Sequence, residues 1–167
     1  VAAIAVHGRT REDFFTGEAE YETVAAVKAA VSIPVLVNGD LTSPEKAAAV
    51  LKATGCDALM LGRPVLGRPW LFREIAHYLA TGQRLSPPEP AEIQAVVSGH
   101  LVALHDFYGE QLGLRIARKH LGWYCREWPG GRDFCNAINR VESAPEQRRR
   151  TAEYLAGLPG HRLDPAA

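Results

Sequence analysis

Short apolar runs alternate with helical patterns along the first half of the chain. The runs span Val1 to Val6, Ile33 to Val37 and Ala58 to Leu61. Runs that are this short and this continuously apolar are typical of strands in a parallel sheet that helices cover. Helices are predicted between them, at about Tyr21 to Ala30 and after Thr42-Ser43-Pro44-Glu45. The pattern therefore predicts about three βα units of an α/β fold.

The segment Thr42-Ser43-Pro44-Glu45 carries the signals of a helix start. It offers a hydroxyl group that can cap the helix, a proline for the first helical position and a glutamate that can complete a capping box. Ser143-Ala144-Pro145-Glu146 is a similar segment later in the chain. We expect a helix to begin at each of these two segments.

A proline-rich segment marks a domain boundary. Trp70 to Ala80 is predicted to be helical, and Ser86-Pro87-Pro88-Glu89-Pro90 follows it and cannot continue a helix. We therefore expect an α/β domain over residues 1–85 and a second domain over residues 86–157. Residues 158–167 are predicted to form a tail.

The second domain has the periodicity of helices. Its first apolar residues recur about every 3.6 positions, at Ile93, Val96, Val97, Leu101, Leu104 and Tyr108. Further helices are predicted at about Gln111 to Glu127, Asp133 to Val141 and Pro145 to Ala156. Four helices connected by short loops predict a small all-α bundle.

Composition and charge limit the class of protein. The chain has 19 basic and 19 acidic residues, so any binding to nucleic acid needs a local basic face. Its three cysteines, Cys56, Cys125 and Cys135, form no CxxC pair and no even disulfide framework. This suits the reducing cytoplasm and predicts no metal site. No apolar run reaches the roughly 18 residues of a membrane span, so no membrane partner is expected.

The chain begins abruptly. It opens inside an apolar run, and its single methionine is Met60. We therefore expect it to be part of a longer polypeptide.

Two polar segments that follow predicted strands form what we call the phosphate clamp. Asn38-Gly39-Asp40 follows the second apolar run, and Gly62-Arg63 follows the third. The carboxyl ends of parallel strands meet at one edge of a sheet, where such folds place their ligand sites. Glycine lets the backbone approach a ligand, the Asn38 amide can orient it, and arginine can fork onto phosphate oxygens. Either segment alone could equally be a turn, but together they favour an anion site.

The first predicted strand ends in His7-Gly8-Arg9-Thr10-Arg11. Its histidine should lie at the same edge as the phosphate clamp, where an imidazole can donate a hydrogen bond to a ligand or stabilise developing charge. A lone histidine is often structural, but this position favours a ligand role. Arg9 and Arg11 could meet an anionic partner or simply be solvated.

Basic residues recur at helical spacing in the second domain. We call four of them the basic stripe: Arg115, Arg118, Lys119 and Arg126. The opposite face of the same predicted helix carries apolar residues, namely Leu114, Ala117 and Leu121. A charged face is usually only solvated, although it can also contact RNA phosphates with salt-sensitive affinity.

Two other groups in this domain point to no site. Arg148, Arg149 and Arg150 are consecutive, so they would point in different directions on a helix and are predicted to be solvated. His100 and His105 are five positions apart, off a common helical face, and make a poor metal pair.

Five motifs, in order along the chain, resemble those of the bacterial tRNA-dihydrouridine synthase family. They are HGRTR at 7–11, the F-x-G-x-A-x-Y pattern from Phe15 to Tyr21, IPVLVNGD at 33–40, DALMLGRPVLGRPWLF at 57–72 and RIARKHLGWY at 115–124. The resemblance implies an FMN-binding TIM (β/α)8 barrel followed by a helical tRNA-binding domain. The three predicted strands would be the sixth, seventh and eighth of that barrel, and the chain would be the carboxyl-terminal portion of the enzyme.

The resemblance also implies roles for residues. His7 would lie beside the flavin, Asn38-Gly39-Asp40 would close over the ribityl phosphate, and Gly62-Arg63 would grip that phosphate. Arg9, Arg11 and the basic stripe would contact tRNA. The family uses NADPH to reduce FMN, and the flavin passes a hydride to C6 of a tRNA uridine while a cysteine protonates C5. The full-length enzyme is expected to be a cytoplasmic monomer.

The resemblance places no catalytic residue in this chain, because the family's catalytic cysteine and its flavin-contacting lysine lie on earlier strands. Cys56 precedes its strand, and Cys125 and Cys135 lie in the helical part, so none of them can substitute. We therefore expect the chain alone to be a poor catalyst and a poor flavin binder. Two alternatives remain open: an FMN-binding TIM-barrel oxidoreductase acting on a small metabolite, and a non-catalytic RNA-binding fragment.

Overall fold

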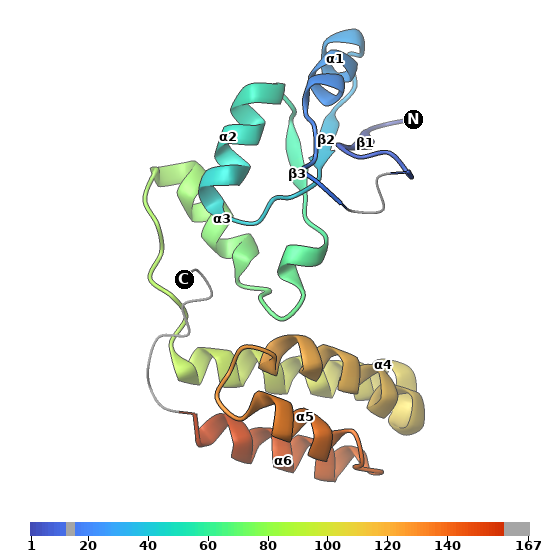
Figure 1. Ribbon diagram of the computed structural model, residues 1–167, viewed down its shortest axis with the longest axis vertical. Helices are drawn as coiled ribbons and strands as arrows, with labels where there is room; N and C mark the ends of the chain where they lie inside the picture. Colours follow the sequence, from blue (N-terminus) through green and yellow to red (C-terminus); the bar gives the residue numbers. More distant parts are fainter. Residues whose placement is uncertain (13–15, 159–167) are drawn as a thin grey trace. The chain divides into compact units, whose positions relative to one another are not determined.

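The computed structural model describes residues 1–12 and 16–158. The chain divides into two compact units, residues 1–85 and 86–167, each with its own core (Figure 1). Phe15 of the F-x-G-x-A-x-Y pattern and residues 159–167 of the predicted tail lie outside the described residues.

A parallel sheet forms the centre of the first unit (Figure 1). The strands β1 (Ile4–His7), β2 (Val35–Asn38) and β3 (Ala58–Met60) pair in that order, and both pairings are parallel. The register places His7 opposite Asn38, and Asn38 opposite Met60. The carboxyl ends of all three strands therefore meet in one line at one edge of the sheet.

Helices connect the strands and follow the last of them. α1 (Glu22–Ala30) lies between β1 and β2, and α2 (Pro44–Thr54) lies between β2 and β3. The short 3-10 helix η1 (Arg63–Val65) and then α3 (Leu71–Thr81) follow β3. The prediction of three parallel βα units is confirmed.

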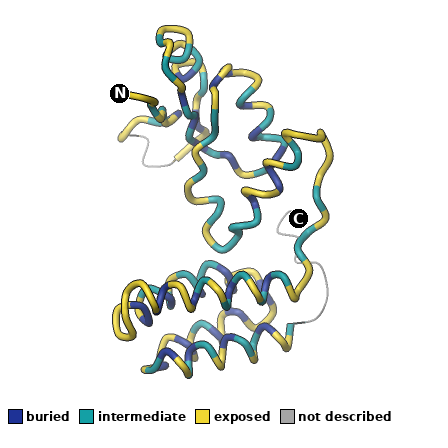
Figure 2. Tube along the Cα trace, turned by 180° about the vertical axis from the view of Figure 1, so that it is seen from behind, coloured by how far each residue is buried: buried dark blue, intermediate teal, exposed yellow. Residues whose placement is uncertain are grey.

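The core of this unit lies between the sheet and its helices. Val35 and Val37 of β2 are fully buried and pack with Val24 of α1 and Val50 of α2. Each buried valine of this kind stabilises the fold by about 1.5–3 kcal/mol. On the opposite face of the sheet Met60 is 49% exposed, so the strands bury one face more completely than the other (Figure 2).

The start of α2 follows the predicted hydroxyl cap but not the predicted box. The Ser43 hydroxyl accepts a hydrogen bond from the backbone N–H of Lys46 at 3.2 Å, and Pro44 occupies the first turn. Because Ser43 rather than Thr42 is the cap, the position that completes a box falls on Lys46. Glu45 instead forms an ion pair with Arg84. The prediction that Glu45 completes a capping box was wrong.

In the second unit, α4 (Pro90–Cys125) reverses direction at Gly109. That residue has a φ of 73° and a ψ of 171°, which interrupt the helix. The two halves of α4 then lie against each other, since the imidazole of His100 is 3.1 Å from the hydroxyl oxygen of Tyr124. The prediction of separate helices on either side of this point is confirmed.

Two further helices, α5 (Gly131–Ile138) and α6 (Ala144–Ala156), pack against α4. All three contribute buried apolar residues to one core, including Val97, Leu101, Leu114, Leu121, Phe134, Ile138 and Leu155. Ser143 caps α6 by accepting a hydrogen bond from the N–H of Glu146 at 3.4 Å. The predicted helical bundle is confirmed.

A polar network is buried inside this bundle. Nε2 of His105 lies 2.9 Å from Oε1 of Gln147, and Nε2 of Gln147 donates to the carbonyl of Leu114 at 3.2 Å. The guanidinium of Arg148 is 3.1 Å from Nδ1 of His105. A guanidinium only donates and an amide oxygen only accepts, so the His105 proton is on Nε2. The network satisfies these buried polar groups and links α6 to both halves of α4.

Gly113 is required where the two halves of α4 approach each other. A Cβ added there would lie 2.8 Å from the carbonyl oxygen of Leu104 and 2.9 Å from Cα of His105. We predict that Gly113→Ala lowers the free energy of unfolding by about 1–3 kcal/mol, because backbone must move to relieve the overlap. Urea unfolding followed by far-UV circular dichroism measures this change.

Gly122→Ala is the matched control in the same helix. Apart from the nearby backbone of its own helix, a Cβ at Gly122 would meet no atom of the described residues within 4 Å. Alanine has the higher helix propensity, so this substitution should raise the free energy of unfolding by up to about 0.5–1 kcal/mol. Equal effects of the two substitutions would show that the close approach at Gly113 is unimportant.

Candidate functional site

The carboxyl edge of the sheet brings the predicted ligand residues together. The backbone carbonyl of Asn38 accepts a hydrogen bond from the N–H of Gly8 at 2.9 Å and lies 3.2 Å from Nδ1 of His7. The side-chain amide of Asn38 donates to the carbonyl of Met60 at 2.5 Å. Asn38 therefore ties the ends of all three strands to one another.

The hydrogen bond at His7 determines what its imidazole can offer. A carbonyl oxygen only accepts, so Nδ1 of His7 carries the proton in this contact. In the neutral ring Nε2 is then an acceptor. The sequence suggested that His7 donates a hydrogen bond to a ligand. In this geometry the neutral imidazole can only accept at Nε2. Donation from Nε2 requires the protonated ring.

The loop after β2 is packed closely against the loop after β1. Gly39 has a φ of 128°, and a Cβ added to it would lie 2.9 Å from Cβ of Ala19 and 3.3 Å from Nδ1 of His7. The hydroxyl of Tyr21 donates to the carbonyl of Gly39 at 2.8 Å. The absence of a side chain at Gly39 therefore allows the two loops to pack together, in addition to any approach of the backbone to a ligand.

The carboxylate of Asp40 receives donors from both neighbouring loops. Its Oδ1 accepts from the guanidinium of Arg9 at 2.7 Å, and its Oδ2 accepts from the backbone N–H of Ala19 at 2.8 Å. The guanidinium of Arg63 lies 3.8 Å from Oδ1. The hydrogen bond from Arg9 is the main cause that holds the pKa of Asp40 below its ordinary value, and partial burial opposes it. Asp40 is therefore ionised at neutral pH.

Arg9 and Arg11 differ in their surroundings. The sequence left open whether each meets an anionic partner or solvent. The side chain of Arg9 is only 4% exposed, with Asp40 as its anionic partner. Arg11 is exposed. Burial leaves the Arg9 guanidinium little surface to present to RNA, whereas Arg11 keeps that possibility.

The segment Gly62-Arg63 combines an uncrowded backbone position with an exposed cation. A Cβ added to Gly62 would meet nothing within 4 Å in residues 1–12 and 16–158, so the backbone is open there within the described structure. The side chain of Arg63 is 58% exposed and adds a delocalised cation beside it. An open glycine next to an exposed guanidinium fits a phosphate group, and the Asn38 amide lies on the neighbouring strand.

Some residues of this edge were not predicted as part of it. Tyr21 and Ala19 fix the loop after β2 through a phenol and a backbone N–H. The sequence held a signal for both, because they belong to the F-x-G-x-A-x-Y pattern. That pattern indicates family, however, and not which atoms the residues contact.

The basic stripe is partly exposed. Leu114, Ala117 and Leu121 are buried, so the amphipathic pattern of this helix is confirmed. Arg115, Lys119 and Arg126 are exposed, with the ammonium of Lys119 5.0 Å from the centre of the Trp123 ring. Arg118 is turned inward and donates to the carbonyl of Val141 at 2.7 Å. Three of the four predicted residues therefore present charge to solvent.

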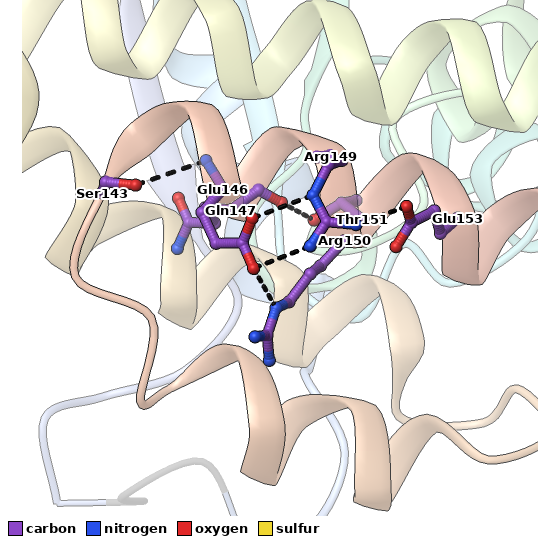
Figure 3. A network of polar contacts seen from close by, with 7 residues as sticks. All are labelled: Ser143, Glu146, Gln147, Arg149, Arg150, Thr151 and Glu153. Atoms are coloured by element: carbon purple, nitrogen blue, oxygen red, sulfur yellow. Dashed lines mark hydrogen bonds and ion pairs between the residues drawn. The ribbon is translucent and has the colours of Figure 1, made fainter.

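Ion pairs hold two of the three consecutive arginines of α6, Arg149 and Arg150 (Figure 3). Arg149 and Arg150 both pair with Glu146, at 2.8 and 2.6 Å, and Arg149 also pairs with Glu153. The hydrogen bonds from Arg149 and Arg150 lower the pKa of Glu146 to about 2. Arg148 points inward to His105. The prediction that this cluster is solvated holds for the exposure of Arg149 and Arg150 but misses their acidic partners.

Two histidines lie together between the halves of α4. The rings of His100 and His120 have centroids 4.6 Å apart, and the Tyr124 hydroxyl is bonded to His100. Burial lowers the pKa of both imidazoles and raises the pKa of Tyr124 to about 12. The described residues contain no group of three or more acidic, histidine or cysteine side chains that could hold a metal ion.

One cysteine lies at the amino end of β3, and the other two lie in the helical unit. Cys56 is buried just before β3, at the end of that strand opposite the carboxyl edge. Cys125 is buried and Cys135 partly so, and burial raises the pKa of both thiols. Raised pKa values keep these thiols protonated and unreactive.

Within the described part of the chain, no helix is long and apolar enough to cross a membrane.

Comparison with known proteins identifies the class. The sequence profile of the dihydrouridine synthase (Dus) family matches residues 1–156. The chain therefore belongs to the dihydrouridine synthase family. Its three parallel βα units and the helices after them agree with the carboxyl-terminal part of a TIM barrel and a helical domain, so the predicted fold class and family are confirmed.

Particular relatives share more than half of their aligned residues with the chain. It is 54% identical to tRNA-dihydrouridine synthase B of Xanthomonas campestris pv. campestris, over 95% of this chain and 49% of that protein. It is 54% identical to tRNA-dihydrouridine synthase B of Pseudomonas aeruginosa, over 93% of this chain and 47% of that protein. The protein of the same name from Yersinia pestis is 51% identical, over 95% and 49%. The chain thus spans about half the length of these curated relatives.

The histidine pair makes the stability of the helical unit depend on pH. Because burial lowers the pKa of His100 and His120 in the folded state, the unfolded chain binds more protons below their ordinary pKa of about 6.5. The free energy of unfolding should therefore be greatest above that pH and fall as the pH decreases toward the lowered folded values. Urea unfolding at a series of pH values between 8 and about 5 measures the slope.

Variants locate the source of this slope. His100→Gln with His120→Gln removes both titrating groups and should flatten the dependence between pH 8 and about 5.5. An unchanged slope in the double variant would assign the acid sensitivity to other groups.

Proposed function

We propose that this chain is the carboxyl-terminal portion of an FMN-dependent tRNA-dihydrouridine synthase. In the full-length polypeptide, NADPH would reduce FMN, and the reduced flavin would convert a tRNA uridine to 5,6-dihydrouridine. The observation that carries this proposal is the line of strand ends in the Dus-family sheet. It places His7, Asn38 and the open Gly62-Arg63 segment at one edge of that sheet.

The residues at this edge divide the work of holding the cofactor. The Arg63 guanidinium and the backbone at Gly39 and Gly62 would hold the phosphate of FMN, since a planar cation and closely approaching backbone suit its oxygens. The Asn38 amide and the His7 imidazole would orient the groups above the phosphate. When bound, FMN supplies the hydride chemistry. What the protein adds here is position and charge.

The catalytic acid lies outside this chain in our proposal. Cys56 lies at the opposite end of β3 from the carboxyl edge, and the thiols of Cys125 and Cys135 are buried or partly buried in the helical unit, so none is assigned a role in protonating uridine. The cysteine and lysine of the family would come from the strands that precede this segment. The chain alone is therefore proposed to be a poor catalyst and a poor flavin binder.

The helical unit is proposed to bind tRNA. Residues 1–85 would form the flavin-binding part and residues 86–157 the RNA-binding part, with Arg11 and the exposed residues of the basic stripe contacting phosphates. A uridine inside folded tRNA must be unstacked before it can reach a flavin. The cytoplasm is the expected compartment, and a monomer the expected form of the full-length enzyme.

The decisive experiment uses a full-length polypeptide that contains this chain. We expect it to purify with bound flavin, to oxidise NADPH and to form dihydrouridine in tRNA that lacks this modification. The 167-residue chain alone should bind FMN weakly and form no product. NADPH oxidation with a small metabolite but not with tRNA would favour the alternative oxidoreductase, and tRNA binding without flavin would favour a non-catalytic RNA-binding protein.

Charge reversal tests the basic stripe. We predict that Arg115→Glu with Lys119→Glu weakens tRNA binding by at least tenfold, and reduces the salt slope of log Kd by about one to two. The physical reason is that the variant neutralises fewer phosphates, so its binding to tRNA releases fewer counterions. Filter binding or fluorescence anisotropy at several salt concentrations measures both quantities.

Arg149→Glu with Arg150→Glu is the matched control, because it changes the net charge equally on another helix of the same unit. These arginines are already paired with Glu146 and Glu153, so their reversal should affect tRNA binding less. If both pairs weakened binding equally, the effect would be one of net charge and not of the stripe.

A further inference from the structure

We propose that Asp40, held in place by Arg9, positions Arg63 for the phosphate of the flavin. Asp40 and Arg9 would then be positioning residues, and neither would contact the cofactor or RNA. This inference rests on the proposed function. It changes the roles that the sequence suggested, namely cofactor contact for Asp40 and RNA contact for Arg9.

Asp40 is the point at which three loops meet. Arg9 and Ala19 belong to the loop after β1, Asp40 itself to the loop after β2, and Arg63 to the segment after β3. Both oxygens of the carboxylate have donors, at 2.7 Å from Arg9 and 2.8 Å from Ala19. Asp40 also has a φ of 44°, which is uncommon for a residue other than glycine. The surrounding contacts therefore hold it in an otherwise unfavourable conformation.

Arg9 anchors this arrangement from inside. Its side chain is 4% exposed, and its second terminal nitrogen donates to the carbonyl of Gly17. Its Nε is buried and has no hydrogen-bond partner among the described residues. A buried guanidinium is costly unless a carboxylate compensates it, so Arg9 and Asp40 fix each other. Asp40 consequently cannot turn toward a ligand without leaving a buried charge unpaired.

Arg63 is the member of the group that can reach a ligand. Its guanidinium lies 3.8 Å from Oδ1 of Asp40 while its side chain is 58% exposed. Long arginine side chains lose rotamer freedom when a ligand fixes them. The fixed carboxylate of Asp40 favours some rotamers of Arg63 before a ligand binds. Less side-chain entropy is then lost when the phosphate fixes the guanidinium.

The test compares FMN with riboflavin, which lacks only the phosphate. In the full-length polypeptide, the ratio of the two dissociation constants reports phosphate recognition, and the riboflavin value reports the rest of the site. We expect Asp40→Asn to reduce the preference for FMN by about tenfold, as for one lost charge-assisted interaction, and to leave riboflavin binding within about twofold. Flavin fluorescence quenching measures both constants.

Asp57→Asn is the matched control. Asp57 accepts hydrogen bonds from the ammonium of Lys28 at 2.6 Å and from the backbone N–H of Val35 at 2.7 Å. It is thus another paired carboxylate in the same unit, but it precedes β3 and lies at the opposite end of the strands. Its substitution should leave the FMN preference unchanged. Arg9→Lys keeps the charge but not the fork, so it should cause a smaller loss than Asp40→Asn, and it carries the test if Asp40→Asn does not fold.

A double-mutant cycle shows whether Asp40 acts through Arg63. Arg63→Gln should itself reduce the FMN preference, and Asp40→Asn should then have little further effect. Three outcomes would overturn the inference. The losses of FMN preference could add up in the double variant, the preference could stay unchanged in both Asp40→Asn and Arg9→Lys, or the affinity for FMN could increase. Failure of the proposed function would look different: the unsubstituted polypeptide, or Arg63→Gln relative to it, would show no phosphate-dependent preference at all.

Discussion

The parallel pairing of three short strands is the constraint on which the rest of the first unit depends. Its register aligns His7, Asn38 and Met60, and so brings together loops that are far apart in the sequence. Each loop by itself carries only a few polar groups. A slip of one residue would turn the buried valines of β2 toward the other face. The burial of Val35 and Val37 against α1 and α2 therefore also fixes the geometry at the carboxyl edge.

Much of this arrangement could be predicted because it follows from local patterns. Continuous apolar runs indicated the strands, and hydroxyl residues before prolines indicated the starts of α2 and α6. One helical pattern was predicted up to Tyr108 and another helix from about Gln111, and the reversal at Gly109 falls between them. Carboxyl ends of parallel strands share an edge, so the proximity of Asn38 and Gly62-Arg63 also followed from topology. The family resemblance rested on whole motifs, and the profile match to residues 1–156 agrees with it.

The partners of charged residues could not be predicted in the same way. Arg9 and Asp40 are separated by 31 positions, and Glu45 meets Arg84 across 39. Arg118 was predicted to contact RNA as part of the basic stripe, but its guanidinium donates to the carbonyl of Val141 on another segment. These pairings depend on how loops fold over one another. Sequence spacing carries no such information when the contacts are not within one helix or strand.

The reversal of α4 at Gly109 also bears on how the helical unit acquires its structure. The closest contacts across the turn join residues only nine positions apart, as between Gly113 and Leu104, whereas the paired residues of the strands are 22 or 31 positions apart. Closing so short a loop costs little chain entropy, and proteins rich in local contacts fold quickly. Strand pairing in the other unit must instead bring together segments separated by whole helices. The helical hairpin is therefore suited to form first during folding, independently of the sheet.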